Sequence, residues 1–237
     1  MTATLLIPAY NEEKRLQPFL ASIVTYTHLH PNQLTEIIVV DDGSSDATAD
    51  VARKFAEELP MLRVISYQPN RGKGAAIQAG VREATSELVI FMDADGATDI
   101  TELPKMLRAL ADHDVAVGNR WLKESQTRRS SWFRHIAGAT YRRYMQLFGI
   151  GEIDTMCGFK GYRLSVAQDL FKDLLESRWL FDTEIAYKAI RRGYRIANFP
   201  IQWESKDGSK LSTGALLKTA FEIWPLIRKI KHQERSR

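Results

Sequence analysis

The chain of 237 residues is long enough for one large α/β domain or for two small ones. Hydrophobic residues make up 44% of it and charged residues 26%, which is ordinary for a folded soluble protein and excludes an intrinsically disordered chain. The net charge is +4, and basic residues concentrate in residues 120–143 and 228–237, which favours contact with phosphates or an anionic membrane surface. Nucleic acid is not expected as a partner, because aromatic stacking platforms do not alternate with this charge.

Cys157 is the only cysteine, so no disulfide can form within the chain, and a reducing, cytoplasmic setting is expected. No run of about eighteen apolar residues is present, which predicts no membrane-spanning helix. The first residues lack a basic leader, so no signal peptide is expected.

The first half of the chain alternates between strand and helix patterns. Short apolar runs predict buried strands at residues 4–8, 36–40, 62–67, 88–92 and 115–118. Helical patterns separate them at residues 12–26, 46–58, 74–84 and 101–111. Strands buried on both faces and joined by helices indicate an α/β fold with a mostly parallel central sheet flanked by helices.

The second half changes character. Residues 130–148 show a helix pattern rich in aromatic residues and arginine, and residues 154–160 are predicted to be a loop. Two helices, one strand and an amphipathic segment are expected next, at residues 164–175, 183–192, 194–203 and 213–232. Pro225 should kink or break the last of these.

Polar or charged residues follow each of the five predicted strands in the first half. Because ligands of open α/β sheets bind at the carboxyl ends of the strands, these residues are candidates for a binding site. Asp93 and Asp95 follow the fourth strand. Two carboxylates one residue apart can turn toward one point, and Mg²⁺ and Mn²⁺ prefer oxygen ligands. The pair therefore predicts a metal and phosphate site, although aspartates also serve turns and caps.

Two further strand ends carry candidate groups. Asp42, at the tip of the second strand, can accept hydrogen bonds from a base edge or from ribose hydroxyls. Residues 70–74 are glycine-rich and open a helix, so their backbone amides could face an anion, or could form a simple turn. This segment contains neither a P-loop nor a dinucleotide-binding fingerprint.

Seven motifs, in one order, resemble those of the family 2 glycosyltransferases with the GT-A fold, and more closely the branch that acts on polyprenyl phosphates, including the dolichyl-phosphate β-glucosyltransferases. They are residues 8–12 (PAYNE), 40–46 (VDDGSSD), 70–74 (NRGKG), 93–98 (DADGAT), 154–160 (DTMCGFK), 178–184 (RWLFDTE) and 208–211 (GSKL). The resemblance implies a Rossmann-like GT-A domain over residues 1–211, followed by an amphipathic, basic helix over residues 212–237.

The resemblance also implies roles for individual residues. The nucleotide-sugar would be bound by Pro8, Tyr10, Glu12, Asp42, Lys73, Asp93, Ala94 and Lys210. Asp95, together with Asp93, would bind a divalent metal, Mg²⁺ or Mn²⁺. Arg120 and Arg134 would face the acceptor phosphate. Asp182 matches the place where family members that act on sugar hydroxyls keep a general base, so Asp95, Asp182 and Arg120 are the expected catalytic residues.

These roles predict an inverting hexosyltransferase that moves glucose from UDP-glucose to a polyprenyl, dolichyl-type phosphate. A lipid phosphate is already ionised at neutral pH, so it needs positioning and charge neutralisation rather than a strong base. A mannosyltransferase that uses GDP-mannose, or a transferase acting on a glycan hydroxyl, remains open. The oligomeric state is also left open.

One residue departs from the family pattern, because related mannosyl enzymes carry a polar residue where this chain has Ala97. The metal would then take its remaining ligands from diphosphate and water. Relatives often carry a membrane helix, and here we expect residues 130–148 and 213–232 to dock instead on the membrane interface, on its cytoplasmic face. Packing of both helices on the core is the alternative.

Overall fold

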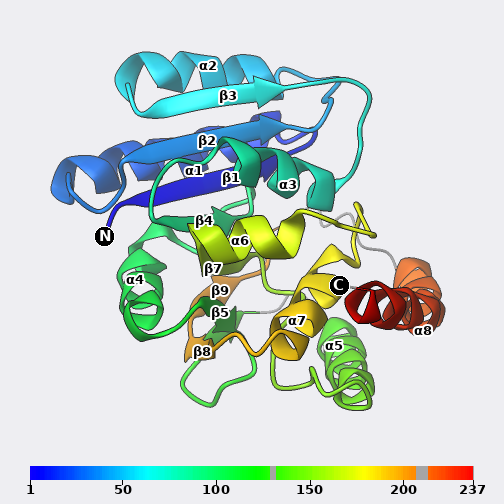
Figure 1. Ribbon diagram of the computed structural model, residues 1–237. Coiled ribbons are helices and arrows are strands. Elements are labelled where there is room, and N and C mark those ends of the chain that lie inside the picture. Colours follow the sequence, from blue (N-terminus) through cyan, green and yellow to red (C-terminus); the bar gives the residue numbers. More distant parts are fainter. Residues whose placement is uncertain (129–131, 207–212, 237) are drawn as a thin grey trace.

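The computed structural model describes residues 1–128, 132–206 and 213–236, with the side chains of residues 132–135, 137 and 213–221 left out. Its centre is a seven-stranded sheet in the order β3-β2-β1-β4-β7-β5-β8 (Figure 1). The strands span β1 Ala3–Ala9, β2 Glu36–Asp41, β3 Leu62–Ser66, β4 Leu88–Met92, β5 Val115–Asn119, β7 Phe159–Arg163 and β8 Ile196–Pro200. A small parallel pair, β6 Gln126–Arg128 and β9 Gln202–Glu204, lies beside it.

Helices cover both faces of the sheet. They span α1 Glu13–Leu29, α2 Thr48–Glu58, α3 Lys73–Glu83, α4 Leu103–Asp112 (after the 3-10 turn Ile100–Glu102), α5 Trp132–Gln146, α6 Leu164–Phe171, α7 Phe181–Arg191 and α8 Thr213–Arg235. The predicted α/β class and mostly parallel sheet are therefore confirmed. No helix in the described ranges is both long and apolar enough to cross a bilayer.

Alternation along the strands divides the core into two layers. In β1, Leu5 and Ile7 pack with α1 and α4, whereas Leu6 points to the opposite layer, against α3. Helix α3 approaches the sheet closely at Gly80, where a Cβ atom would lie only 2.0 Å from a methyl carbon of Leu6. This close approach holds the N-terminus of α3 next to the carboxyl ends of β1 and β4.

Strand β7 was not predicted. It lies between β4 and β5 and runs antiparallel to both, with Lys160 opposite Phe91 and Val117. The predicted loop at residues 154–160 therefore ends at Phe159, because the sequence FKGYR continues as a buried strand. Neither an apolar run nor a regular alternation marks that segment, so its pattern predicted a loop.

Three other boundaries differ from the predictions. The expected strand at residues 194–203 is divided at Ile201, with β8 in the main sheet and β9 in the small one. Helix α6 ends at Phe171 rather than at residue 175. Of the predicted kink or break at Pro225, the break does not occur, because α8 continues through this residue, as α1 does through Pro18. Both prolines are exposed, so the carbonyl groups that lose a helical partner can bind water.

A third apolar cluster joins α5, α7 and α8 at one end of the sheet (Figure 1). Ile223, Ile227 and Ile230 of α8 are buried there against Tyr141 and Met145 of α5. The described second half of α8 thus packs on the body of the protein through one face.

Candidate active site

A cleft of about 530 Å³ opens at the carboxyl ends of the parallel strands. It is lined by the described residues predicted from the sequence to form the site: Pro8, Tyr10, Glu12, Asp42, Lys73, Asp93, Ala94, Asp95, Arg120 and Asp182. Lys210 lies outside the described residues, and the side chain of Arg134 is also outside them. The structure therefore brings these predicted residues together in one cleft.

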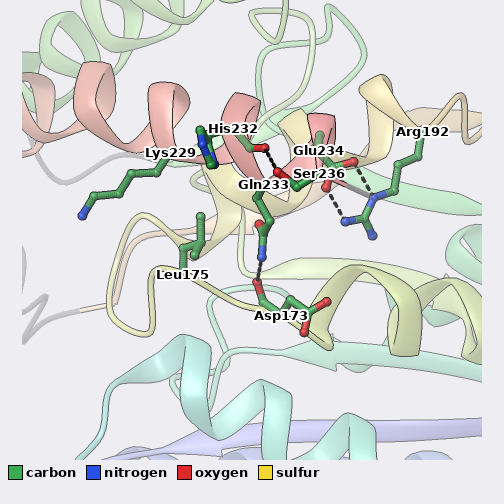
Figure 2. A pocket seen from close by; sticks show the side chains of 8 residues that line it. All are labelled: Asp173, Leu175, Arg192, Lys229, His232, Gln233, Glu234 and Ser236. Atoms are coloured by element: carbon green, nitrogen blue, oxygen red, sulfur yellow. Dashed lines mark hydrogen bonds and ion pairs between the residues drawn. The ribbon is translucent and has the colours of Figure 1, made fainter.

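A second hollow, of about 540 Å³, lies between the end of α8 and the segment after α6 (Figure 2). Its charged and polar groups bind one another. Arg192 forms an ion pair with Glu234, and the Gln233 amide donates to the carbonyl oxygen of Asp173. These contacts join α8 to the body of the protein. The carboxylates predicted from the sequence to act in binding or catalysis line the first cleft instead.

Asp93 is held by an ion pair with Lys73, whose Nζ lies 2.5 Å from its Oδ1. Lys73 is the first residue of α3, and the packing of that helix on β1 and β2 brings its side chain to Asp93. Burial alone would raise the pKa of Asp93, but the nearby cations Lys73, Lys160 and Arg120 together outweigh burial and hold the pKa below its ordinary value. Gly158 makes room for the carboxylate, because a Cβ atom there would lie 1.9 Å from Asp93 Oδ2.

The negative charge of Asp95 is less well balanced by nearby cations than that of Asp93. Its Oδ1 accepts a hydrogen bond from the amide of Ala97, and its Oδ2 lies 3.9 Å from Arg15 Nη1. Burial and the neighbouring charge of Asp93 raise the pKa of Asp95 above its ordinary value. A carboxylate in this state gains from a bound cation, so its chemistry fits a divalent metal. No three His, Cys, Asp or Glu side chains group around one point within the described residues, so among these residues Asp95 and Asp93 are the pair to consider for a metal.

Asp42 is buried and organises the glycine-rich segment. It accepts hydrogen bonds from the amides of Arg71 and Gly72, each at 2.8 Å, and from the Asn70 side chain at 2.7 Å. The expectation that these amides face an anion is therefore met by a carboxylate of the chain itself. Asp42 also lines the cleft. It therefore forms part of the cleft wall and also holds the neighbouring residues of that wall in place.

Arg120 also lines the cleft and is held in a fixed orientation. Its Nε and Nη2 donate to the two carboxylate oxygens of buried Asp154, at 2.8 and 2.9 Å. The guanidinium carbon lies 5.0 Å from the ring centre of Trp203. A guanidinium gripped at two points keeps its direction, which suits recognition of a planar or tetrahedral anion.

Asp182, at the first turn of α7, forms an ion pair with Lys160, whose Nζ lies 2.8 Å from its Oδ1. Both side chains are almost fully buried. Burial raises the pKa of Asp182, although Lys160 and Lys73 act in the opposite direction. Asp182 is thus a partly compensated carboxylate at the edge of the cleft.

Comparison with known proteins identifies the family. The sequence profile of "Glycosyl transferase family 2" matches residues 4–171. The chain belongs to this family. A dolichyl-phosphate beta-glucosyltransferase of Trichomonas vaginalis is 34% identical over 232 residues, covering 93% of this chain and 69% of the relative. The human dolichyl-phosphate beta-glucosyltransferase is also 34% identical, covering 88% and 69%. This family 2 enzyme is accordingly a nucleotide-sugar-dependent hexosyltransferase.

Solved structures share the fold. Glucosyl-3-phosphoglycerate synthase of Mycobacterium tuberculosis, solved with Mn²⁺, UDP and glucosyl-3-phosphoglycerate, has a TM-score of 0.72 and 15% identity, covering 97% of this chain and 79% of that one. A mannosyltransferase of Pyrobaculum calidifontis, with GDP-Man and Mn²⁺, has a TM-score of 0.60 and 23% identity, covering 88% and 57%. The expected GT-A fold is confirmed.

Several residues that line the cleft of this glycosyltransferase were not predicted. They are Arg15, Tyr141, Met156, Arg178, Trp179, Trp203 and Lys206, among others. Met156, Arg178 and Trp179 stand within two of the motifs quoted from the sequence, which were usable signals. The others come from helices, from β9 and from connecting segments, and their approach to the cleft depends on packing between distant parts of the chain. Asp154, which pairs with Arg120, and Lys160, which pairs with Asp182, also belong to a motif quoted from the sequence, but the sequence predicted no role for them.

Proposed function

We propose that this glycosyltransferase moves glucose from UDP-glucose to the phosphate of a dolichyl-type polyprenyl phosphate, with inversion at the sugar carbon. The names of relatives that are 30–35% identical over most of the chain support the acceptor and the sugar. UDP as the donor nucleotide is our inference from the same relatives, and GDP-mannose is the alternative that the sequence left open.

The proposal rests on how the side chains of Arg120 and Asp182 are held in the cleft. Arg120 is aimed and rigid, whereas Asp182 is engaged by Lys160. An acceptor phosphate is ionised at neutral pH, so it needs an aimed cation more than a free base. A phosphate oxygen would attack the anomeric carbon while the bond to the diphosphate breaks, and the electron pair would leave with the nucleotide. No proton needs to move in this step.

A divalent metal, Mg²⁺ or Mn²⁺, fits the donor set of Asp95 with Asp93 nearby. When bound, it would neutralise the charge that develops on the leaving diphosphate. Lys73 adds a fixed positive charge next to Asp93. The structures of related fold that hold Mn²⁺ with a nucleotide support this assignment.

We further propose that Pro8, Tyr10, Glu12 and Asp42 hold the base and ribose, with Ala94 lining the sugar site. Arg134 would face the acceptor phosphate with Arg120, and Lys210 would close over the diphosphate. The first four line the cleft, and Asp42 also organises residues 70–72, of which Asn70 and Gly72 line it as well.

The acceptor is a lipid, so we propose that α5 and α8 dock on the cytoplasmic face of a membrane, with residues 212–237 as the dedicated segment. Trp224 is 65% exposed and Leu147 is 77% exposed, and the Trp224 ring contacts Phe148. Exposed basic side chains stand on the same two helices: Arg143 on α5, and Arg228, Lys229 and Lys231 on α8. Gly138 and Tyr141 of α5 line the cleft, so this helix would connect it to the bilayer surface.

A panel of nucleotides tests the donor without an acceptor. UDP, UDP-glucose, GDP and GDP-mannose are each added with Mn²⁺ or Mg²⁺, and the unfolding midpoint is measured. A ligand that binds only the native state raises the midpoint, so UDP and UDP-glucose should raise it and the guanine nucleotides should not. Transfer of labelled glucose to dolichyl phosphate is then measured with the donor that binds. A shift with GDP-mannose alone would reject glucose transfer from UDP-glucose.

Transfer to a glycan hydroxyl is the second candidate, and one observation favours it. The raised pKa of buried Asp182 would make it a better proton acceptor than an ordinary carboxylate. That function predicts transfer to a soluble glucoside, lost in Asp182→Asn. Transfer to dolichyl phosphate but not to glucosides would reject it.

A further inference from the structure

Lys160 is a buried cation to which no role has yet been given. Its side chain is only 2% exposed, although it stands in the middle of β7, at the centre of the sheet. Three oxygen atoms lie around Nζ: the carbonyl oxygen of Cys157 at 2.5 Å, that of Thr155 at 3.2 Å, and Asp182 Oδ1 at 2.8 Å. Nζ donates hydrogen bonds to the two carbonyl oxygens and forms an ion pair with the carboxylate, so it draws these groups toward one point.

Two of those oxygens belong to one short segment, residues 154–158, which precedes β7. Asp154 in this segment grips Arg120. Gly158 in the same segment accepts a hydrogen bond from the amide of Asp93 at 3.2 Å and leaves room for its carboxylate. Met156, between them, lines the cleft. A backbone segment that turns its carbonyl groups inward needs a buried donor, and Lys160 provides it.

We propose that Lys160 is a positioning residue for the acceptor side of the site. It ties residues 154–158 to Asp182 at the start of α7, and through Asp154 it fixes the direction of the Arg120 guanidinium. The donor side depends on it less, because Asp93 directly follows β4 and is held by Lys73, while Asp42 organises residues 70–72. Lys160 touches the site through these groups rather than through the substrate.

Cys157 allows a test that needs no enzymatic activity. It is the only cysteine, it is fully buried, and burial raises the pKa of its thiol to about 11. Alkylation by iodoacetamide therefore reports opening of residues 154–158. In Lys160→Met the carbonyl groups of this segment lose their donor, and we expect Cys157 to be labelled at least about tenfold faster than in the wild type.

Lys188 provides the matched control. It is also a fully buried lysine, and its Nζ binds Glu184 Oε1 at 2.6 Å and the carbonyl oxygen of Asp173 at 2.8 Å. Lys188→Met should lower the unfolding midpoint in the same way, because it too removes the cation paired with a buried carboxylate, but Cys157 should stay protected. Equal acceleration of labelling in the two variants, at equal midpoints, would reduce Lys160 to a general stabilising residue and overturn the proposal.

Kinetics supply the second arm, which rests on the proposed acceptor. In Lys160→Met, kcat/KM for dolichyl phosphate should fall about 100-fold, since small misplacements of a binding group have effects of this size. The Kd for UDP with Mn²⁺ should stay within about twofold of the wild type, a difference well below 1 kcal/mol. Lys160→Arg, which keeps the charge and the donors, should recover part of the loss. A fall in UDP affinity equal to the fall in transfer would contradict an acceptor-side role.

A further variant covers the case in which Lys160→Met does not fold. Lys160→Met with Asp182→Asn removes the unpaired carboxylate while the carbonyl groups still lack their donor, so fast labelling of Cys157 should persist. Protection equal to that of the wild type would overturn the proposal. If the wild type does not transfer to dolichyl phosphate, the proposed function fails, while the labelling and UDP-binding measurements still decide the role of Lys160.

Discussion

Lys73 and Asp93 form an ion pair of 2.5 Å in the cleft, and this pairing makes the two carboxylates of the DADG motif unequal. The pKa of Asp93 is lowered, with burial opposed chiefly by Lys73, whereas burial and Asp93 raise the pKa of Asp95. Asp93 is therefore stable as an anion without a metal, and Asp95 is the carboxylate that a cation would stabilise. A sequence motif that reads as a symmetric pair has two different members in the folded chain.

Asp95→Asn should abolish metal-dependent transfer and leave the fold intact. Because the amide keeps the shape but loses the negative charge, kcat should fall about 100-fold or more. The midpoint shift that Mn²⁺ adds to UDP binding should disappear as well. Asp99→Asn is the control, since Asp99 caps the following turn outside the cleft and asparagine caps equally well. Near-normal activity of Asp95→Asn would remove this residue from the site.

Arg120→Lys should damage the acceptor side more than the donor side. Lysine keeps the charge but cannot bind both oxygens of Asp154 in the same plane, so kcat/KM for the acceptor should fall about 10-fold to 100-fold. Binding of UDP, measured by calorimetry, should change little. Arg195→Lys is a matched control, because Arg195 makes a similar two-point contact with Asp114 at an exposed position. Equal losses in UDP binding and transfer would place Arg120 with the donor.

Gly158→Ala should impair the donor side. The added Cβ atom would lie 1.9 Å from Asp93 Oδ2, so the carboxylate or the segment must move, and kcat/KM for the nucleotide-sugar should fall at least about tenfold. Gly149→Ala is the control: it also changes a glycine, with φ of +74° and open space around it, and should lower stability by about 1 kcal/mol without loss of activity. Full activity of Gly158→Ala would mean that Asp93 needs no fixed place.

Trp224→Ala should weaken binding to vesicles. An exposed indole that enters the interface contributes apolar burial, so affinity for vesicles containing phosphatidylserine should fall about tenfold. Leu29→Ala removes another exposed apolar side chain, at the end of α1, and should have no effect. Cosedimentation at low salt measures both. Failure of the wild type to bind would reject the docking of α5 and α8.

The first half of the site could be predicted because one rule governs it. Parallel strands bring their carboxyl ends to one edge, so Asp42, Asp93, Asp95 and Arg120 were expected together, and the cleft contains all four. Local pattern alone sets the places of these residues, since each follows an apolar run.

The second half could not be predicted in the same way. Strand β7 contains Lys160 at a buried position, and burial of a lysine depends on partners that come from other segments, such as Asp182. From a sequence pattern, a lysine is expected to be exposed to solvent, so the pattern predicts a loop here and not a buried strand. Trp203 and Tyr141 reach the cleft from β9 and α5, and their approach follows from packing that no local pattern records.

Strand β7 also imposes an order on folding. The four adjacent strands β3, β2, β1 and β4 are complete by Met92, but β5 can join them only after residues 159–163 have been made, because β7 lies between β4 and β5. Long-range pairings of this kind form late and slow a folding reaction. During synthesis, the edges of β4 and β5 stay open over that interval and are exposed to association with other chains. A fragment that ends before Phe159 would keep the carboxylates of the first half and lose the strand that joins the two halves of the enzyme.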